Sequence, residues 1–331
     1  MVSTGPPVLE VRDLSVSVPV GSDRRATVVE DVTLSIDAGR TVGLVGESGS
    51  GKSMTSLAIM GLLPGVAEVD AGEVRLEGEN LLEKTPKEMS ELRGKRMSMV
   101  MQDPMTSMDP SFTLRSQLAE PLRKHRHLRG RQLDEAIVTS LEQVYLSADP
   151  KRQKQFPHQL SGGMRQRACS AIALAAPPRL LIADEPTTAL DVTTQARYLH
   201  VLRELQETVD FAMLLISHDL FVVRHMCERV LIMYSSQVVE EGPVAEVFAN
   251  PQHPYTRALL DAIPKPGENS ALESIGGQAP DASEEIVGCR FAARCKYARD
   301  ECRSSAPELT ERGDSRAARC WGTEDGGWVD L

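Results

Sequence analysis

Glycine, serine and lysine are concentrated in one short segment of the chain, Gly46-Glu47-Ser48-Gly49-Ser50-Gly51-Lys52-Ser53. An apolar run, Thr41 to Val45, precedes this segment, and a helical pattern, Met54 to Leu62, follows it. Glycines allow the backbone to curl so that successive N–H groups point inward, and the following helix adds its positive N-terminal end. In such a loop a lysine reaches the β- and γ-phosphates of a nucleotide, and a serine hydroxyl ligates Mg²⁺. The predicted nucleotide-binding residues are Gly46, Ser48, Gly49, Ser50, Gly51, Lys52 and Ser53.

Two adjacent carboxylates, Asp184 and Glu185, follow the aliphatic run Leu180 to Ala183. Such a run predicts a buried strand, which would place both carboxylates at its carboxyl end, where open α/β sheets bind nucleotides. We expect Asp184 to hold Mg²⁺ through its water shell. We expect Glu185 to be the general base that prepares the attacking water.

A second helix start that could face phosphate lies at Ser161-Gly162-Gly163, ahead of the helical stretch Met164 to Ala176. A serine at the N-cap and two small residues leave backbone N–H groups able to face an anion. Since the chain already contains one phosphate loop, a second anion site implies a second nucleotide.

Four of the six cysteines, Cys289, Cys295, Cys302 and Cys320, lie near the carboxyl end of the chain. Their spacing is looser than the paired C-x₂-C of a zinc ribbon. Iron–sulfur ligands, zinc ligands and unligated thiols all remain open from the residues alone. We expect nearby basic residues to favour thiolates; they are Arg290, Arg294, Lys296 and Arg303.

The elements that would carry these residues alternate between strand and helix. Residues 8–45 are rich in predicted strands, and further strands are expected at Val74 to Leu76, Met97 to Met101, Leu180 to Ala183 and Ala212 to Ser217. A helical pattern runs from Thr113 to Ser147. Strands separated by helices predict an α/β fold with a mostly parallel, helix-covered sheet.

Length and composition agree with a folded chain of two domains. The chain has 331 residues, and roughly one domain is expected per 150 residues. Residues 264–288 are rich in Pro, Gly, Ser, Ala and Glu, as linkers are, so we predict domains at 1–264 and 265–331. The 37 basic and 47 acidic residues leave a net charge of −10, which argues against nucleic acid as a partner. No apolar stretch approaches the roughly 20 residues that span a bilayer.

The segment Leu160 to Arg167, with the sequence LSGGMRQR, resembles the signature motif of ATP-binding cassette (ABC) ATPases. The resemblance implies a P-loop NTPase core with an antiparallel β subdomain and a helical subdomain, here with a small cysteine-containing C-terminal extension. It also implies that two ATPase subunits face head to tail. Each ATP would then lie between the Lys52 region of one subunit and the Ser161 region of the other.

Three further residues match the order of the family's motifs. Gln102 resembles the Q-loop glutamine, which touches Mg²⁺ or the attacking water and connects to the membrane partner. The segment Ala189-Leu190-Asp191 resembles the D-loop, which contacts the opposite subunit, and His218 resembles the switch histidine that bonds the γ-phosphate. The family also stacks adenine on an upstream aromatic residue, whereas this chain has none before Phe112, and Val18 aligns there. We therefore predict weak discrimination between ATP and GTP.

The segment Asn250 to Arg257, continuing to Pro264, and the segment Gly288 to Phe291 resemble the C-terminal motif of oligopeptide, dipeptide and nickel importer ATPases. We expect the first to be a proline-containing turn followed by a short amphipathic helix, with Leu259, Leu260 and Ile263 on one face. Some members of this family carry an iron–sulfur cluster in this region. The resemblance therefore favours a structural [4Fe–4S] cluster on the four cysteines.

The resemblance implies an ATPase, with ATP and Mg²⁺, that powers import of dipeptides or oligopeptides at the cytoplasmic face of the bacterial inner membrane. It implies two transmembrane permease subunits, a second ATPase subunit (a copy or a paralogue) and an extracellular or periplasmic substrate-binding protein. An importer of nickel or another small solute and a soluble ABC ATPase outside transport are the alternatives. A third alternative is an ATPase controlled by a redox- or iron-sensing tail.

Overall fold

The computed structural model describes residues 5–21, 23–103, 107–188, 190–263, 275–313 and 315–323, which belong to two compact units. The carboxylate unit comprises the described residues of 1–10, 35–41 and 75–216. The phosphate-loop unit comprises those of 11–34, 42–74 and 217–331. A strand whose residues fall in both ranges belongs to the unit that contains most of them. The predicted boundary between Pro264 and Lys265 lies outside the described residues, so the two-domain division stays a prediction.

Three parallel strands form the centre of the carboxylate unit: β6 (Met97–Val100), β7 (Leu180–Asp184) and β8 (Ala212–Ser217), in the order β8-β7-β6. All residues of β7 and β8 are buried, as expected of parallel strands covered on both faces. Because parallel strands end at the same edge, the residues that follow β6 and β7 are brought together. The predicted strands and the α/β class are confirmed.

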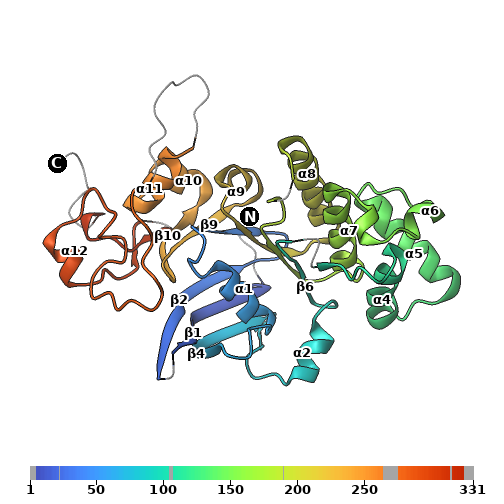
Figure 1. The fold of residues 1–331 in the computed structure, drawn as a ribbon, viewed down its shortest axis with the longest axis horizontal. Helices are drawn as coiled ribbons and strands as arrows, with labels where there is room; N and C mark the ends of the chain where they lie inside the picture. The colour runs from blue at the N-terminus through green and yellow to red at the C-terminus, as the bar shows by residue number, and fades with distance from the viewer. Residues whose placement is uncertain are drawn as a thin grey trace. The chain divides into compact units, whose positions relative to one another are not determined.

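Helices account for most of the remaining carboxylate unit. They are α2 (Pro86–Leu92), α4 (Leu114–Arg126), α5 (Gly130–Gln143), α6 (Pro150–Gln153), η1 (Pro157–Gln159), α7 (Gly162–Leu174) and α8 (Val192–Val209). Helix α4 packs against α5 and α7 (Figure 1). Its buried residues include Leu114, Leu118 and Leu122, a spacing that places them on one face. The helical pattern predicted from residue 113 to 147 is therefore confirmed.

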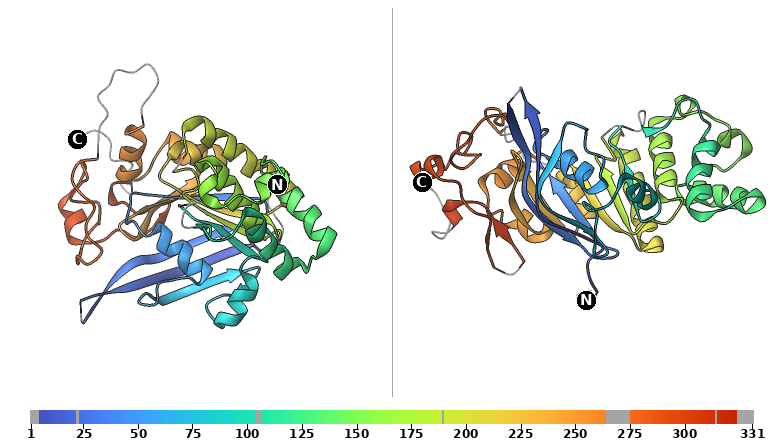
Figure 2. Two further views of the ribbon diagram at one scale, coloured as in Figure 1. Left: turned by 45° about the vertical axis from the view of Figure 1, so that its right-hand side comes forward. Right: turned by 90° about the horizontal axis from the view of Figure 1, so that it is seen from below.

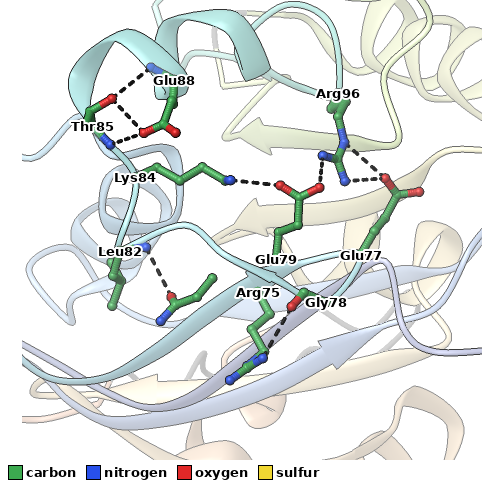
Figure 3. Close-up of polar contacts among 10 residues, drawn as sticks. Arg75, Glu77, Gly78, Glu79, Leu82, Lys84, Thr85, Glu88 and Arg96 are labelled. Carbon is green, nitrogen blue, oxygen red and sulfur yellow. Dashed lines mark hydrogen bonds and ion pairs between the residues drawn. The ribbon is translucent and has the colours of Figure 1, made fainter.

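Charged side chains around Arg96, at the start of β6, form a network of ion pairs (Figure 3). The Arg96 guanidinium lies between two carboxylates, 2.7 Å from Glu77 Oε2 and 2.6 Å from Glu79 Oε1. Arg179, just before β7, bonds the other oxygen of Glu77 at 2.9 Å. Hydrogen bonds from Lys84 and Arg96 lower the pKa of Glu79 to about 2. The ends of β6 and β7 opposite to Asp184 are thus joined through Glu77, next to the short strand β5 (Glu79–Asn80).

The phosphate-loop unit contains a second set of strands, in the order β4-β1-β2-β10-β9-β3. Their bounds are β1 Leu9–Val20, β2 Arg24–Ile36, β3 Thr41–Val45, β4 Glu68–Leu76, β9 Arg229–Tyr234 and β10 Gln237–Pro243. Strands β1 and β2 are the long blue strands that run side by side in Figure 2. Strand β3, which leads into the phosphate loop, is parallel to β9 and buried at every residue.

The antiparallel hairpin β9–β10 escaped the sequence analysis. Its turn is Ser235-Ser236, and both serines have positive φ, 44° and 72°. Two-residue hairpin turns of this kind usually carry Asn or Gly, so the sequence lacks the usual signal.

The remaining elements of this unit are mostly short. They are α1 (Lys52–Met60), α9 (Leu220–Met226), α10 (Val244–Ala249), α11 (Pro254–Asp261), α12 (Asp300–Ser304), β11 (Thr310–Glu311), β12 (Ala317–Ala318) and η2 (Trp321–Thr323). Helix α11 confirms the helix expected after Asn250, but its buried residues are Pro254, Tyr255 and Thr256. Ile263 lies beyond the end of α11 and is 38% exposed, and Leu259 and Leu260 are half-buried, so the predicted apolar face is not the most buried side of the helix.

Candidate functional site

The loop between β3 and α1 has a backbone that only glycine allows at two positions. A Cβ on Gly46 would lie 2.2 Å from the Met233 carbonyl oxygen, and a Cβ on Gly51 would lie 2.4 Å from that of Val28. Gly51 also has φ +103°, in the region that other residues rarely adopt. The two glycines let the loop pass close to neighbouring backbone, which is the compact curl that phosphate binding needs.

Lys52 lies inside this loop. Its side chain is buried, with the residue 5% exposed, and Nζ donates to the carbonyls of Gly46 at 2.9 Å and Glu47 at 2.8 Å. Gly51, the N-cap of α1, brings no side-chain hydrogen bond to the first turn of the helix. The helix start therefore presents backbone N–H groups and a lysine charge together, which fits the phosphates of a nucleotide.

The outer residues of the loop differ in exposure. Ser48, Gly49 and Ser53 are exposed, whereas Ser50 is buried and its carbonyl accepts a hydrogen bond from Ser236 N at 3.0 Å. The hairpin turn that the sequence analysis missed thus supports the loop. Val18, where the family's aromatic residue would align, lies half-buried on β1, and the weak preference for ATP over GTP stays a prediction.

In the carboxylate unit, Asp184 and Glu185 occupy the end of β7. Asp184 is 5% exposed. Glu185 has φ +45°, and its N–H donates to the Ile216 carbonyl at 2.9 Å, so the next strand holds the chain in this left-handed turn. A left-handed conformation costs a residue other than glycine about 1 kcal/mol, and such strain is concentrated at functional sites.

Gln102 and Glu185, predicted separately, are in direct contact. Gln102 Nε2 donates to Glu185 Oε2 at 2.9 Å, although the two residues are 83 positions apart. Thr188 Oγ1 donates to the same oxygen at 2.9 Å. Thr188 escaped the sequence analysis; a hydroxyl three residues after a carboxylate in a turn was the available signal. The Glu185 carboxylate is therefore oriented by two donors.

The start of α7 has the predicted capping arrangement. Ser161 is exposed, and its side chain accepts from Met164 N at 3.4 Å. Gly162 and Gly163 form the first turn, and a Cβ on Gly163 would lie 2.5 Å from Thr194 Cγ2. The glycine therefore allows the start of α7 to pack closely against the start of α8.

Asp191 caps α8. Its Oδ1 accepts from the backbone N–H groups of Thr193 at 3.1 Å and Thr194 at 3.0 Å, and hydrogen bonds from Thr194 hold the pKa of the carboxyl below its usual range. Ala189, the first residue of the predicted D-loop, lies outside the described residues. His218 is exposed directly after β8 and belongs to the phosphate-loop unit.

The predicted iron–sulfur site is wrong. All four cysteines line one pocket, but the described residues contain no group of three or more His, Cys, Asp or Glu side chains that could hold a metal ion. This finding also speaks against zinc there. The residues concerned are Cys289, Cys295, Cys302 and Cys320.

The surroundings of the cysteines explain the error. The pocket wall is completed by apolar groups such as Phe291 and Trp321. Burial raises the pKa of the Cys295 thiol to about 12 and also raises that of Cys289. Two of the four basic residues expected to favour thiolates are paired with carboxylates instead, Arg290 with Glu30 and Arg294 with Glu47. Neutral thiols therefore suit this apolar pocket better than thiolate ligands do.

Within the part of the chain that the structure describes, no helix is long and apolar enough to cross a membrane.

Comparison with protein families gives two matches. A model described as ABC transporter matches residues 29–188, and one described as Oligopeptide/dipeptide transporter, C-terminal region, matches residues 239–302. The first match contains the phosphate loop and both carboxylates. The second contains most of β10, all of α11 and three of the four C-terminal cysteines.

Relatives of similar length support both matches. The oligopeptide transport ATP-binding protein AppD of Bacillus subtilis is 44% identical, over 90% of this chain and 92% of the relative. The dipeptide transport ATP-binding protein DppD of Lactococcus lactis is 43% identical, over 95% and 90%. Among solved structures, a dimeric ATP-binding cassette, MJ0796, bound to ADP and Pi is 26% identical, with a TM-score of 0.63, over 71% of this chain and 98% of that one.

Proposed function

The chain belongs to the ABC transporter family of ATP-binding proteins, and we propose that it is the ATP-hydrolysing subunit of a bacterial peptide importer. The observation that supports this most is the loop from Gly46 to Ser53, in which a buried lysine and two required glycines surround a helix start. The proposed activity is tested by altering Glu185, which should abolish ATP hydrolysis and leave ATP binding intact.

ATP binding is assigned to the phosphate loop. The backbone N–H groups of Gly49 and Gly51 and the ammonium of Lys52 bind the phosphates, with Ser48 and Ser50 in the same loop. His218 is assigned to the γ-phosphate. The Mg²⁺ ligands expected from the sequence are Ser53, Gln102 and Asp184, which carry the hydroxyl, amide and carboxylate oxygens that Mg²⁺ accepts. When bound, Mg²⁺ neutralises charge on the β- and γ-phosphates.

Glu185 is assigned as the general base. It accepts a proton from the water that attacks the γ-phosphorus, while the bond from this phosphorus to the β–γ bridging oxygen breaks and ADP leaves. The hydrogen bonds from Gln102 and Thr188 orient the Glu185 carboxylate for this step. Both donors bond one oxygen, Oε2.

Ser161, Gly162, Gly163 and Asp191 are assigned to the contact with a second ATPase subunit. The exposed helix start at Ser161 would cover the nucleotide bound to the partner subunit, and the partner's corresponding helix start would cover the nucleotide bound to this subunit. The solved relative named as dimeric supports this pairing.

The relatives named as oligopeptide and dipeptide transport proteins support a peptide cargo. We propose that the subunit lies at the cytoplasmic face of the inner membrane, with two transmembrane permease subunits. A separate peptide-binding protein outside the membrane delivers the cargo.

The test compares Glu185→Gln with Glu207→Gln, an exposed residue of α8. Glu185→Gln keeps the hydrogen-bonding shape but removes the base, so hydrolysis should fall about a hundredfold or more while ATP affinity stays within twofold. Glu207→Gln should leave both unchanged. Phosphate release and nucleotide titration measure the two quantities, and unchanged turnover in Glu185→Gln would contradict the assignment.

A second measurement addresses the cargo. In the complex with its permease and binding protein, reconstituted in vesicles, hydrolysis should rise when a dipeptide or oligopeptide is supplied and not when nickel is. Stimulation by nickel alone would replace the peptide assignment.

A further inference from the structure

Glu47, in the phosphate loop, is held through all three of its polar groups. Its carbonyl accepts from Lys52 Nζ at 2.8 Å, and its N–H donates to the Tyr255 hydroxyl at 2.9 Å. Its carboxylate accepts two bonds from Arg294, at 2.8 Å from Nη1 and 3.1 Å from Nη2. Two of these three groups are therefore held from α11 and the C-terminal segment, more than 200 positions away in the chain.

Arg294 is itself fixed in one place. Its side chain is 6% exposed, and Nε donates to the Gly276 carbonyl at 2.9 Å. Its guanidinium carbon lies 5.6 Å from the centre of the Tyr234 ring, within cation–π distance. Tyr234 packs against Tyr255 and Phe291, with ring centres 4.6 Å and 5.2 Å away. The arginine is thus oriented toward Glu47.

The pairing has an electrostatic consequence for the loop. Glu47 is the one acidic residue of the segment Gly46 to Ser53, and a bare carboxylate there would repel a triphosphate. The bidentate Arg294 bond neutralises this charge. It also restrains the residue whose carbonyl bonds Lys52.

We propose that Arg294 is a positioning residue for nucleotide binding, which holds the phosphate loop through Glu47 and neutralises the carboxylate beside the phosphates. The C-terminal segment thereby takes part in ATP binding without contacting ATP. This inference rests on the proposed role of the Gly46–Ser53 loop.

The test uses the full chain and measures MgATP affinity together with kcat and KM. Arg294→Met should weaken MgATP binding about tenfold and raise KM similarly, with kcat changed less than twofold, because the base Glu185 is untouched. Arg294→Lys keeps the positive charge but cannot form the bidentate bond to Glu47, so we expect MgATP binding to weaken about threefold.

The double variant Arg294→Met/Glu47→Gln separates charge from folding. Removing the bare carboxylate should restore affinity to within threefold of the unaltered chain, a non-additive result that a purely structural loss would not produce. Failure of the double variant to recover would overturn the electrostatic part of the proposal.

Arg290→Met is the matched control. Arg290 comes from the same segment, pairs with Glu30 of β2 and donates to the Ser235 carbonyl in the β9–β10 turn, and both partners lie outside the Gly46–Ser53 loop. It should lower thermal stability and leave MgATP affinity unchanged. Equal weakening in Arg290→Met, or unchanged affinity in a folded Arg294→Met, would overturn the inference.

Arg294→Lys covers the remaining outcome. Should Arg294→Met fail to fold, Arg294→Lys decides: the proposal requires weaker MgATP binding in this variant, and unchanged binding in it would overturn the proposal. An unaltered chain that binds MgATP no better than Lys52→Met would instead refute the proposed function.

Discussion

The phosphate loop, residues 46–53, and the cysteine-bearing segment, residues 275–323, both carry residues that can bind a ligand, but their structures differ. In the loop, Lys52 donates hydrogen bonds to carbonyls five and six positions away, and two glycines allow the backbone to approach neighbouring carbonyls closely. Among the described residues of the segment, four cysteines line an apolar pocket, but no group of side chains there could hold a metal ion.

This difference shows that the spacing of residues in the sequence predicts a binding site reliably when the residues are close together in the chain. Consecutive residues share one backbone path, so a run of glycines and a lysine has few arrangements. Cys289 and Cys320 are separated by an irregular chain, a helix and two short strands, and packing decides where their side chains point. The segment instead contacts the phosphate loop through Arg294, which bonds the Glu47 carboxylate.

The largest expected effect is that of Lys52→Met. Removing the charge at the phosphates should lower hydrolysis about a thousandfold, since one lost electrostatic stabiliser costs about 10²–10³ in rate. Phosphate release measures it. Lys124→Met, on the exposed surface of α4, serves as the control, and a Lys52→Met chain within tenfold of the unaltered rate would contradict the loop's role.

Gly51→Ala should be next in size. The added Cβ meets the Val28 carbonyl and the residue has φ +103°, so we expect destabilisation of about 3 kcal/mol. The shift of the urea midpoint measures this. Gly65→Ala, where a Cβ meets nothing within 4 Å, should shift it little, and equal shifts in the two variants would show that the loop backbone is tolerant.

His253 provides a pH test near the C-terminal segment. It is 1% exposed, its Nδ1 accepts from Tyr255 N at 3.1 Å, and burial lowers its pKa to about 3 from 6.5. As the pH falls below 6.5 the unfolded chain gains a proton that the folded chain refuses. The stability contributed by neutral His253 is therefore lost between pH 6.5 and about 3.

The expected loss from His253 is about 2 kcal/mol between pH 6.5 and 5, at about 1.4 kcal/mol per pH unit. His253→Asn keeps an acceptor that does not titrate, so its urea midpoint should vary less with pH over this range. Parallel pH profiles for the two proteins would contradict a neutral buried histidine.

The smallest effect concerns Cys295. Burial raises its pKa to about 12, so alkylation by iodoacetamide should quicken only about tenfold per pH unit from pH 7 to 10, without levelling off. Peptide mass spectrometry gives the rate. An alkylation rate that levels off near pH 9 or below would indicate an accessible thiolate. The cysteine-bearing segment would then differ less from the phosphate loop in its capacity to bind a ligand.

Much of the fold could be predicted from the sequence. Strands β6, β7 and β8, and the helices between residues 113 and 147, have periodic or continuous apolar patterns long enough to identify. The β9–β10 hairpin was missed because serines occupy a turn that usually contains Asn or Gly. The buried face of α11 was predicted wrongly because the chain that packs on a helix decides its inner face.

By itself, the sequence determined the strand–loop–helix around Lys52 and the carboxylates at the end of β7. In both cases neighbouring residues share a backbone whose conformation depends on local apolar pattern and on the absence of a Cβ. Only the tertiary structure decided that Gln102 orients Glu185 across 83 positions, that Arg294 reaches Glu47 across 247, and that the cysteines face an apolar pocket. Contacts between distant residues depend on how whole elements pack, and no short stretch of sequence encodes that packing.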